Sequence, residues 1–435
     1  MEFLRYDSYK PANSPWLLEV PGHWKLLPGL AVLKANKDKN VGMIEETVLS
    51  LSYGKVIIKP PEKLTGLVPE SFETYQIINP NDIIIRPTDL QNDHTSLRTG
   101  FAKDRGIITS AYICLRPDPS HNPAFIHYLL HAYDLLKVFY GMGSGLRQNL
   151  DYRDFKRLEL CIPPRDEQDR IVSFLDQKTA EIDEAVAKKQ RLIDLLKEQK
   201  TILINQAVTK GLNSDVAMCD SGVDWIGDIP KHWEVKKLKY YSEVQSGITL
   251  GKLYSGNKLV SVPYLRVANV QDGYFKLDEM AELQLPQRVI DQYLVRFGDI
   301  LVTEGGDIDK LGRGTVWGGE IENCIHQNHI FAVRIKKTVA SEYFVSLAMG
   351  ADYGRKYFTH TANKTTNLAS TNQTKLGNFP IALPPLCEQM LLIDYVKDIN
   401  AKYGVVIATA EEEILNLYEL KQIIVAEAVT GKIKL

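Results

Sequence analysis

The chain contains the same long helical segment twice, and this duplication limits the folds open to it. Residues 163–211 and residues 384–431 both open on Pro-Pro, continue to Glu-Gln and reach Ala-Val-Thr near their ends, and the offset between the two copies is 221 both at Pro-Pro and at Ala-Val-Thr. Proline suits the first turn of a helix, and Gly211 and Gly431 suit its end. The sequence therefore predicts two helices of about 45 residues, each about 68 Å long at 1.5 Å per residue.

Each copy also carries an apolar seam with a spacing of 3.5 residues, which is typical of a coiled coil rather than of a globular surface helix. Lys200 and Lys421 interrupt the two seams at equivalent positions. Matching interruptions favour two helices that pack on each other as a pseudo-twofold pair, and the alternative is two independent surface helices. The predicted helix-pair seam consists of Val172, Leu175, Ile182, Val186, Ile193, Leu196, Leu203, Ile393, Val396, Tyr403, Ile407, Ile414, Leu417 and Ile424.

A second repeat precedes each copy of the helix. Residues 16–24 and 225–233, here called the tryptophan segments, both begin with Trp and end in Pro-X-His-Trp. Their histidines, His23 and His232, have no nucleophile nearby in the sequence, so we expect them to be structural rather than catalytic. The chain thus divides into a first segment (1–24), a first body (25–162), a first helix (163–211), a linker with the second tryptophan segment (212–233), a second body (234–383) and a second helix (384–435).

The two bodies also correspond to each other. Asp82 and Asp299 are turn residues that lead into short apolar runs, so each is predicted to precede a buried strand. Helices are predicted at 123–139 and 341–358. The fold class is therefore α+β, with one strand-rich fold used twice and carrying two different sets of loops.

The loops hold the residues that we predict to contact DNA. Arg, Asn and Gln can read base edges with two hydrogen bonds, while Gly, Ser, Thr and Lys suit close approach to phosphates. For any single residue, an ordinary solvated loop is the alternative. In the first body the candidates are Arg86, Thr88, Gln91, Asn92, His94, Thr95, Ser96, Arg98, Ser144, Arg147, Gln148 and Asn149. In the second body they are Arg266, Asn269, Thr303, Glu304, Arg313, Gln327, Asn363, Lys364, Thr365 and Asn367.

Composition and missing motifs exclude several classes of protein. The net charge of −2 argues against a large independent nucleic-acid footprint, and the five cysteines lie far apart, as expected of reduced thiols in the cytoplasm. No apolar run approaches the length that a membrane-spanning helix needs, so no membrane span is expected. Nucleotide-binding and methyltransferase motifs are absent. Cys324, His326 and His329 have metal-like spacing, but we expect a strand with polar outward residues there and no metal site.

The order of these elements resembles the specificity subunits of type I restriction-modification enzymes. The resemblance covers nearly the whole chain and rests on the paired tryptophan segments, the paired Pro-Pro-X-X-Glu-Gln helix starts and the Ala-Val-Thr helix ends. Passages at 263–270, 298–307 and 366–373 also look like sequences common in that family. No single motif is decisive, but the doubled order is specific.

The resemblance implies a noncatalytic subunit with two target-recognition domains, separated by a pair of long antiparallel coiled-coil helices. Each domain would read one half of a bipartite, asymmetric target in double-stranded DNA. Two methyltransferase subunits would use S-adenosylmethionine to methylate adenines, and two motor-endonuclease subunits would use ATP and Mg²⁺, while this chain would bind no cofactor. The alternatives are a stand-alone nuclease or methyltransferase with an unrecognised motif, and a coiled-coil scaffold that binds only proteins.

Overall fold

The computed structural model describes residues 4–60, 62, 71–93, 95–143, 148–252, 254, 258–306, 311–312, 314–364 and 369–435. The chain forms two compact units. Unit 1 contains residues 1–190 and 410–435, and unit 2 contains residues 191–409. Each unit therefore combines one body and one tryptophan segment with one half of each long helix.

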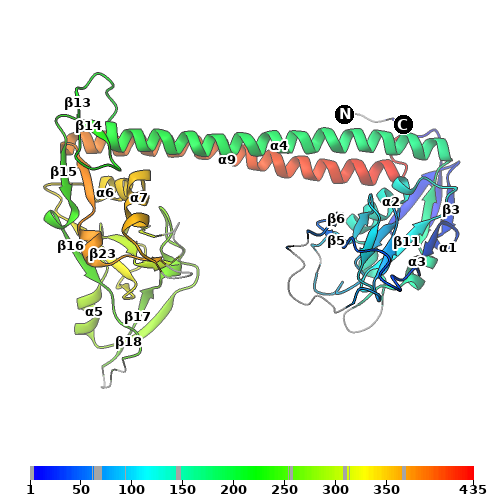
Figure 1. Ribbon diagram of the computed structural model, residues 1–435, viewed down its shortest axis with the longest axis horizontal. Coiled ribbons are helices and arrows are strands. Elements are labelled where there is room, and N and C mark those ends of the chain that lie inside the picture. Colours follow the sequence, from blue (N-terminus) through cyan, green and yellow to red (C-terminus); the bar gives the residue numbers. More distant parts are fainter. Residues whose placement is uncertain are drawn as a thin grey trace. The chain divides into compact units, whose positions relative to one another are not determined.

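The two long helices are α4 (Arg165–Lys210) and α9 (Leu386–Val429) (Figure 1). Their first turns are fixed in the same way, because Gln168 Nε2 donates to Pro163 O and Gln389 Nε2 donates to Pro384 O, both at 2.9 Å. Both helices end at a glycine in the left-handed region, Gly211 with φ 73° and Gly431 with φ 77°. The predicted helices are thus present, and their bounds lie close to the Pro-Pro and glycine signals.

The two helices pack on each other within each unit. In unit 1 the first half of α4 contacts the last turns of α9, where Ile182 and Ile424 share one core and Lys421 Nζ donates to Asp183 Oδ1 at 2.6 Å. In unit 2, Ala207 shares a core with Ile393. None of the predicted seam side chains is exposed. Apolar residues off the seam, such as Leu415, face solvent instead.

The tryptophan segments attach to the first turns of these helices. His23 Nε2 lies 2.8 Å from Glu167 Oε2, and His232 Nε2 lies 2.8 Å from Glu388 Oε2. In both cases the carboxylate occupies the helix N-terminus, where the helix dipole favours negative charge. Both histidines therefore have the same structural contact in the two halves of the chain.

The central sheets of the two bodies have the same strand order. Unit 1 has the order β4-β11-β8-β9 and unit 2 has the order β16-β23-β19-β21, and all these pairs are antiparallel. The predicted turn aspartates occupy equivalent places. Asp82 pairs with Arg116 at 2.8 Å, and Asp299 pairs with Arg334 at 2.7 Å. The duplication in the sequence is thus a duplication of fold.

In unit 1 the strands are β1 (Tyr9–Ser14), β2 (Leu17–Pro21), β3 (Lys25–Pro28), β4 (Leu33–Ala35), β5 (Leu49–Ser52), β6 (Lys55–Ile58), β7 (Gln76–Ile78), β8 (Ile83–Ile85), β9 (Thr99–Phe101), β10 (Gly106–Ile108), β11 (Ile113–Pro117) and β12 (Glu159–Ile162). The helices of its body are α1 (Gly29–Val32), α2 (Pro123–Leu135), η2 (Val138–Gly141) and α3 (Tyr152–Arg157).

In unit 2 the strands are β13 (Met218–Asp220), β14 (Asp228–Pro230), β15 (Glu234–Lys237), β16 (Ser242–Ser246), β17 (Val260–Leu265), β18 (Ala281–Leu285), β19 (Ile300–Thr303), β20 (Gly305–Gly306), β21 (Gly314–Val316), β22 (Ile325–His326), β23 (Ile330–Ile335), β24 (Asn363–Lys364), β25 (Ala369–Ser370) and β26 (Pro380–Leu383). The helices of its body are η3 (Leu238–Tyr240), η4 (Val267–Asn269), α5 (Gln287–Tyr293), α6 (Glu342–Gly350), α7 (Asp352–Thr361) and α8 (Gln373–Gly377).

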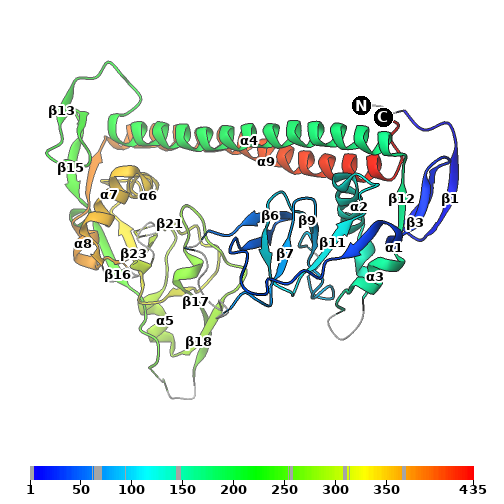
Figure 2. The ribbon, with the colours of Figure 1, turned by 45° about the vertical axis from the view of Figure 1, so that its right-hand side comes forward.

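Two of the predicted body helices are interrupted. The helix predicted at 123–139 ends at Leu135, because Lys137 adopts φ 60° before η2 begins. The helix predicted at 341–358 breaks at Ala351, whose extended backbone separates α6 from α7. In unit 1, α2 lies against the helix pair in both views (Figures 1 and 2), where Tyr128 Oη donates to Asp176 Oδ1 at 2.7 Å.

The prediction of a strand with outward polar residues near Cys324 is wrong. Cys324 and His326 are almost fully buried, and His326 Nδ1 lies 2.9 Å from Ile330 O. No group of three or more His, Cys, Asp or Glu among the described residues is placed to hold a metal ion. In the same part of the chain, no helix is long and apolar enough to cross a membrane.

Candidate nucleic-acid interface

The loop that follows β8 in unit 1 is built around Arg98. This side chain is fully buried, and its guanidinium donates to the carbonyl oxygens of Thr88 at 2.8 Å and Asp93 at 2.6 Å. Nε also donates to Tyr140 Oη at 3.2 Å. Arg98 was predicted to contact DNA. That prediction is wrong, because the buried guanidinium donates its hydrogen bonds to backbone carbonyls of the loop and to the Tyr140 hydroxyl.

The second predicted loop of unit 1 joins the first. Asn149 Oδ1 accepts a hydrogen bond from Asp89 N at 3.0 Å, and Leu150 N donates to Pro87 O at 2.9 Å. Gln148 Nε2 donates to the carbonyl of Tyr140 at 2.7 Å, so it holds its own loop. The structure therefore brings together two polar loops that are far apart in the sequence.

Several side chains of this loop pair remain open to solvent. Thr88, Gln91, Asn92 and Thr95 are exposed. Half-buried Arg86 lies 3.3 Å from Asp93, whose pKa is lowered to about 2, chiefly because the Ser96 backbone N–H donates to the carboxylate. Asp93 therefore stays ionised and positions Arg86 and Ser96. The predicted contacts His94, Ser144 and Arg147 lie outside the described residues.

Asp134, on α2, is hydrogen-bonded to the same loop through the backbone of Arg98. Its carboxylate accepts the Arg98 backbone N–H at 2.6 Å, while Oδ1 has no partner among the described residues. Burial raises the pKa of Asp134 to about 6. At a pH between the unfolded pKa of about 4 and the folded pKa of about 6, the carboxyl group therefore binds a proton when the chain folds.

This raised pKa gives a pH-dependent prediction. The contribution of Asp134 to stability is fully present below its unfolded pKa of about 4 and is lost as pH rises through 6, by up to about 3 kcal/mol. Asp134→Asn removes the titration and keeps an acceptor for Arg98 N. We therefore expect wild type to lose stability relative to this variant between pH 4 and pH 6 in urea unfolding. A constant difference across that range would contradict the assignment.

In unit 2, the predicted residues gather at the ends of two parallel strands. Arg266 follows β17 and Gln327 follows β22, and Gln327 N donates to Leu265 O at 3.0 Å. Glu304 lies close to Gln327, because its carboxylate is 2.7 Å from Nδ1 of His329, which follows Gln327 by two residues. Arg266, Gln327 and Glu304 are half-buried and so retain solvent-accessible surface.

The second loop of unit 2 reaches the same place through a small sheet of order β20-β25-β24. Thr371 N donates to Glu304 O at 2.7 Å, and this hydrogen bond connects the residue after β25 to the residue after β19. Asn363 and Lys364 on β24 are exposed. Arg313, Thr365 and Asn367 lie outside the described residues.

Two predictions in unit 2 are wrong. Asn269 is buried, and its amide accepts from Arg266 N at 2.8 Å and donates to Lys276 O at 2.8 Å, so it shapes a turn. Thr303 is also buried, as the last residue of β19. Both positions are structural because their polar groups face the protein.

A basic stripe on α7 was missed. Arg355, Lys356 and His360 are exposed on one helix, and together with Lys364 they line a cavity of about 560 Å³ that also includes Trp225. Lys356 and Lys364 have no ion-pair partner among the described residues. The signal was present in the sequence, because positions 355, 356, 359 and 360 lie on one face of a helix that we predicted.

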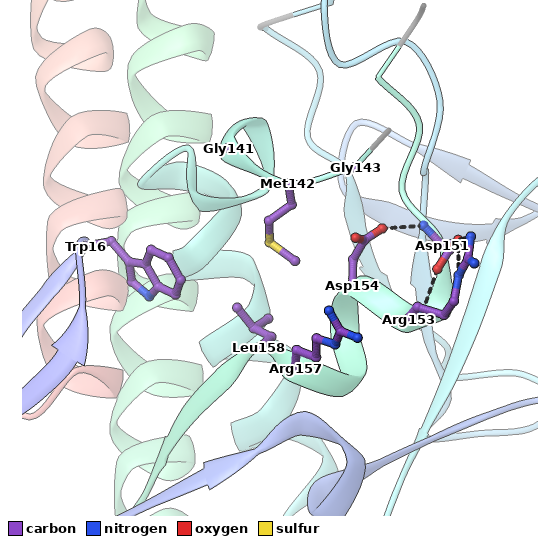
Figure 3. A pocket seen from close by; sticks show the side chains of 9 residues that line it. All are labelled: Trp16, Gly141, Met142, Gly143, Asp151, Arg153, Asp154, Arg157 and Leu158. Atoms are coloured by element: carbon purple, nitrogen blue, oxygen red, sulfur yellow. Dashed lines mark hydrogen bonds and ion pairs between the residues drawn. The ribbon is translucent and has the colours of Figure 1, made fainter. Parts of the chain in front are cut away.

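The corresponding tryptophan of unit 1 also lines a cavity. Trp16 lines a cavity of about 550 Å³ together with Met142, Arg153 and Arg157, and the Arg153 side chain points to Asp151 (Figure 3). Asp151 caps α3 and pairs with Arg153, so part of the charge in this cavity is neutralised internally. Trp16 packs edge-on against Tyr133, and Trp225 packs edge-on against Tyr357. The first tryptophan of each tryptophan segment therefore forms a wall of a cavity in its own unit.

Known proteins share both the sequence pattern and the fold. The type I restriction modification DNA specificity domain matches residues 34–193. The EcoKI specificity subunit of Escherichia coli K12 is 22% identical over 95% of this chain and 90% of its own length. Over nearly its whole length the chain is similar to type I restriction-modification specificity subunits.

Two further comparisons agree with this family. A putative MjaX specificity subunit of Methanocaldococcus jannaschii is 26% identical, and the match spans 44% of this chain and 44% of the relative. A structure solved for the assembly and conformational transition of a type I restriction-modification system has a TM-score of 0.67 at 16% identity. It covers 95% of this chain and 99% of its own chain, so the fold is shared over nearly the full length of both.

Proposed function

We propose that this subunit reads a bipartite, asymmetric sequence in double-stranded DNA, with one body for each half. The observation that carries the proposal is the shared strand order of the two central sheets combined with different loop residues at their ends. One fold with two loop sets is suited to two different half-sites. In unit 1 the readers are Arg86, Thr88, Gln91, Asn92, Thr95 and Ser96, and in unit 2 they are Arg266, Glu304, Gln327 and Asn363, while Lys364 is assigned to phosphate contact.

The proposal assigns all chemistry to partner subunits. Two methyltransferase subunits would bind S-adenosylmethionine and methylate an adenine in each half-site, and two motor-endonuclease subunits would use ATP and Mg²⁺. These partners would also supply much of the phosphate contact, which fits the net charge of −2. The complex would act in the cytoplasm, where its DNA target lies.

The α7 stripe supplies phosphate contacts in this proposal. Lys356 and Lys364 line one cavity next to the second loop of unit 2, and neither has an ion-pair partner among the described residues. A lysine at a phosphate adds about 0.9 to the slope of log affinity against log salt and carries no sequence information.

A double variant tests these phosphate contacts. We expect Lys356→Ala with Lys364→Ala to lower the salt slope by about 2 and to weaken binding evenly across DNA sequences. The measurement is a salt titration of DNA binding by the complex of this subunit with its methyltransferase partner. Lys34→Ala is the control, because Lys34 already pairs with Asp118. A changed second half-site with an unchanged slope would assign base reading to these lysines instead.

Selection from random DNA tests the proposed function itself. The complex with the methyltransferase subunit is expected to enrich two unlike half-sites separated by a gap of fixed length. The purified chain with S-adenosylmethionine, or with Mg²⁺, should neither methylate nor cut plasmid DNA. Modification by the chain alone would favour the enzyme alternative, and binding without sequence preference would favour the scaffold.

A further inference from the structure

The two seam lysines, Lys200 and Lys421, have different surroundings although they occupy equivalent positions. In unit 1, Lys421 Nζ donates to Asp183 Oδ1 at 2.6 Å. The position that corresponds to Asp183 in the second helix, at the same offset as the rest of the repeat, is Gly404. Lys200 in unit 2 therefore lacks the equivalent carboxylate, and it has no hydrogen bond or ion pair with any described residue.

Lys200 lines a cavity of about 520 Å³ that lies wholly within unit 2. One wall is formed by α4 and α9 and includes Lys200, Lys397 and Asn400. The opposite wall is formed by the body and includes Tyr343 and Arg355. The volume falls in the range of small-molecule sites, and few polar groups converge on it from both walls.

The charge in this cavity is unbalanced. Its lining contains three cations, Lys200, Lys397 and Arg355, against the single carboxylate of Asp272, which is paired with Arg355. Lys397 Nζ lies 3.7 Å from Asp394 and 5.9 Å from the centre of the Tyr343 ring. An unpaired, partly buried ammonium group is costly unless an anion or water compensates it.

We propose that this cavity binds the phosphate group of a small molecule, with Lys200 as its main ligand. Lys397 provides a second cation on the same wall, and Tyr343 offers a ring for an organic portion. A bound phosphate bridges the helix pair and the recognition body of unit 2. It thereby replaces the carboxylate that Asp183 supplies in unit 1. The inference does not rest on the proposed function, and its main ligand, Lys200, lies outside the DNA-reading loops and the α7 stripe, although Arg355 lines both cavities.

Gly404 offers a precise way to test the site, because a Cβ built there meets no atom within 4 Å. Gly404→Asp places a carboxylate where unit 1 has one, and Gly404→Asn adds the same shape without the charge. Both substitutions remove a glycine from a helix interior, so neither should unfold the chain. Lys200→Met removes the proposed ligand and keeps the length of the side chain.

The experiment is calorimetric titration of the full chain with inorganic phosphate at constant ionic strength. Wild type and Gly404→Asn are expected to bind one phosphate, while Lys200→Met and Gly404→Asp are expected to bind at least tenfold more weakly. A second titration with adenosine 5′-monophosphate distinguishes a nucleotide from free phosphate as the natural ligand. Tighter binding of the nucleotide than of phosphate indicates a nucleotide, and equal or weaker binding indicates the free ion. The proposal is overturned if wild type binds no phosphate, or if Gly404→Asp binds as wild type does.

Discussion

Glu167→Ala is expected to lower the free energy of unfolding by about 3 kcal/mol, whereas Glu388→Ala should cost about 1 kcal/mol. Glu167 is buried and accepts hydrogen bonds from Tyr6 Oη and from Trp24 Nε1, the latter at 3.1 Å, besides its contact with His23. Its loss leaves the N–H of a fully buried indole without an acceptor. Leaving such a donor unsatisfied costs more than losing a solvent-exposed pair.

Glu388 is the matched control for this prediction. It occupies the same position in the second helix, but only its contact with His232 is equivalent, because Trp233 Nε1 has no partner among the described residues. Urea unfolding gives the two losses, and hydrogen exchange of residues 6–24 locates the first of them in unit 1. Equal losses for the two variants would show that the additional contacts of Glu167 contribute nothing.

Inserting four residues into both long helices is expected to lengthen the gap between the half-sites by one or two base pairs. Four helical residues add about 6 Å, and DNA advances about 3.4 Å per base pair. The insertions belong after Gln190 in α4 and after Glu412 in α9, because Lys189 pairs with Glu413 across the helix pair. Inserted there, they preserve the contacts on both sides.

A single insertion is the control for the helix experiment. Four extra residues in α4 alone shift its seam against α9, so the hydrogen bond of Lys421 with Asp183 and the core shared by Ile393 and Ala207 cannot both be kept. This variant is expected to lose sequence-specific methylation, and the double insertion to retain it. Altered half-sites with the old gap in the double insertion would contradict a spacing role for the helices.

The long helices and the duplicated bodies were predictable because their signals are local and repeated. Pro-Pro at the start, glycine at the end and a spacing of 3.5 residues define a helix without knowledge of the tertiary fold. The break at Ala351 was not predictable in the same way. The apolar spacing of residues 341–358 continues across the break, because buried residues of both α6 and α7 belong to one core, and only the extended backbone of Ala351 separates the two helices.

The reading loops were predictable as segments but not residue by residue. Arg98 and Asn269 have the polarity of base-reading side chains, yet they use their hydrogen bonds on nearby backbone groups. A sequence does not distinguish a donor that faces the protein from one that faces outward. The α7 stripe was predictable from the sequence, because its residues have the spacing of one helix face.

Genome-wide mapping of adenine methylation in cells that carry this subunit and its methyltransferase partner tests the central claim most directly. The predicted result is two unlike half-sites separated by a fixed gap. Replacing residues 234–383 by the second body of another specificity subunit should change only one of these half-sites. A contiguous motif, or a replacement that changes both half-sites, would contradict the account of two independent readers.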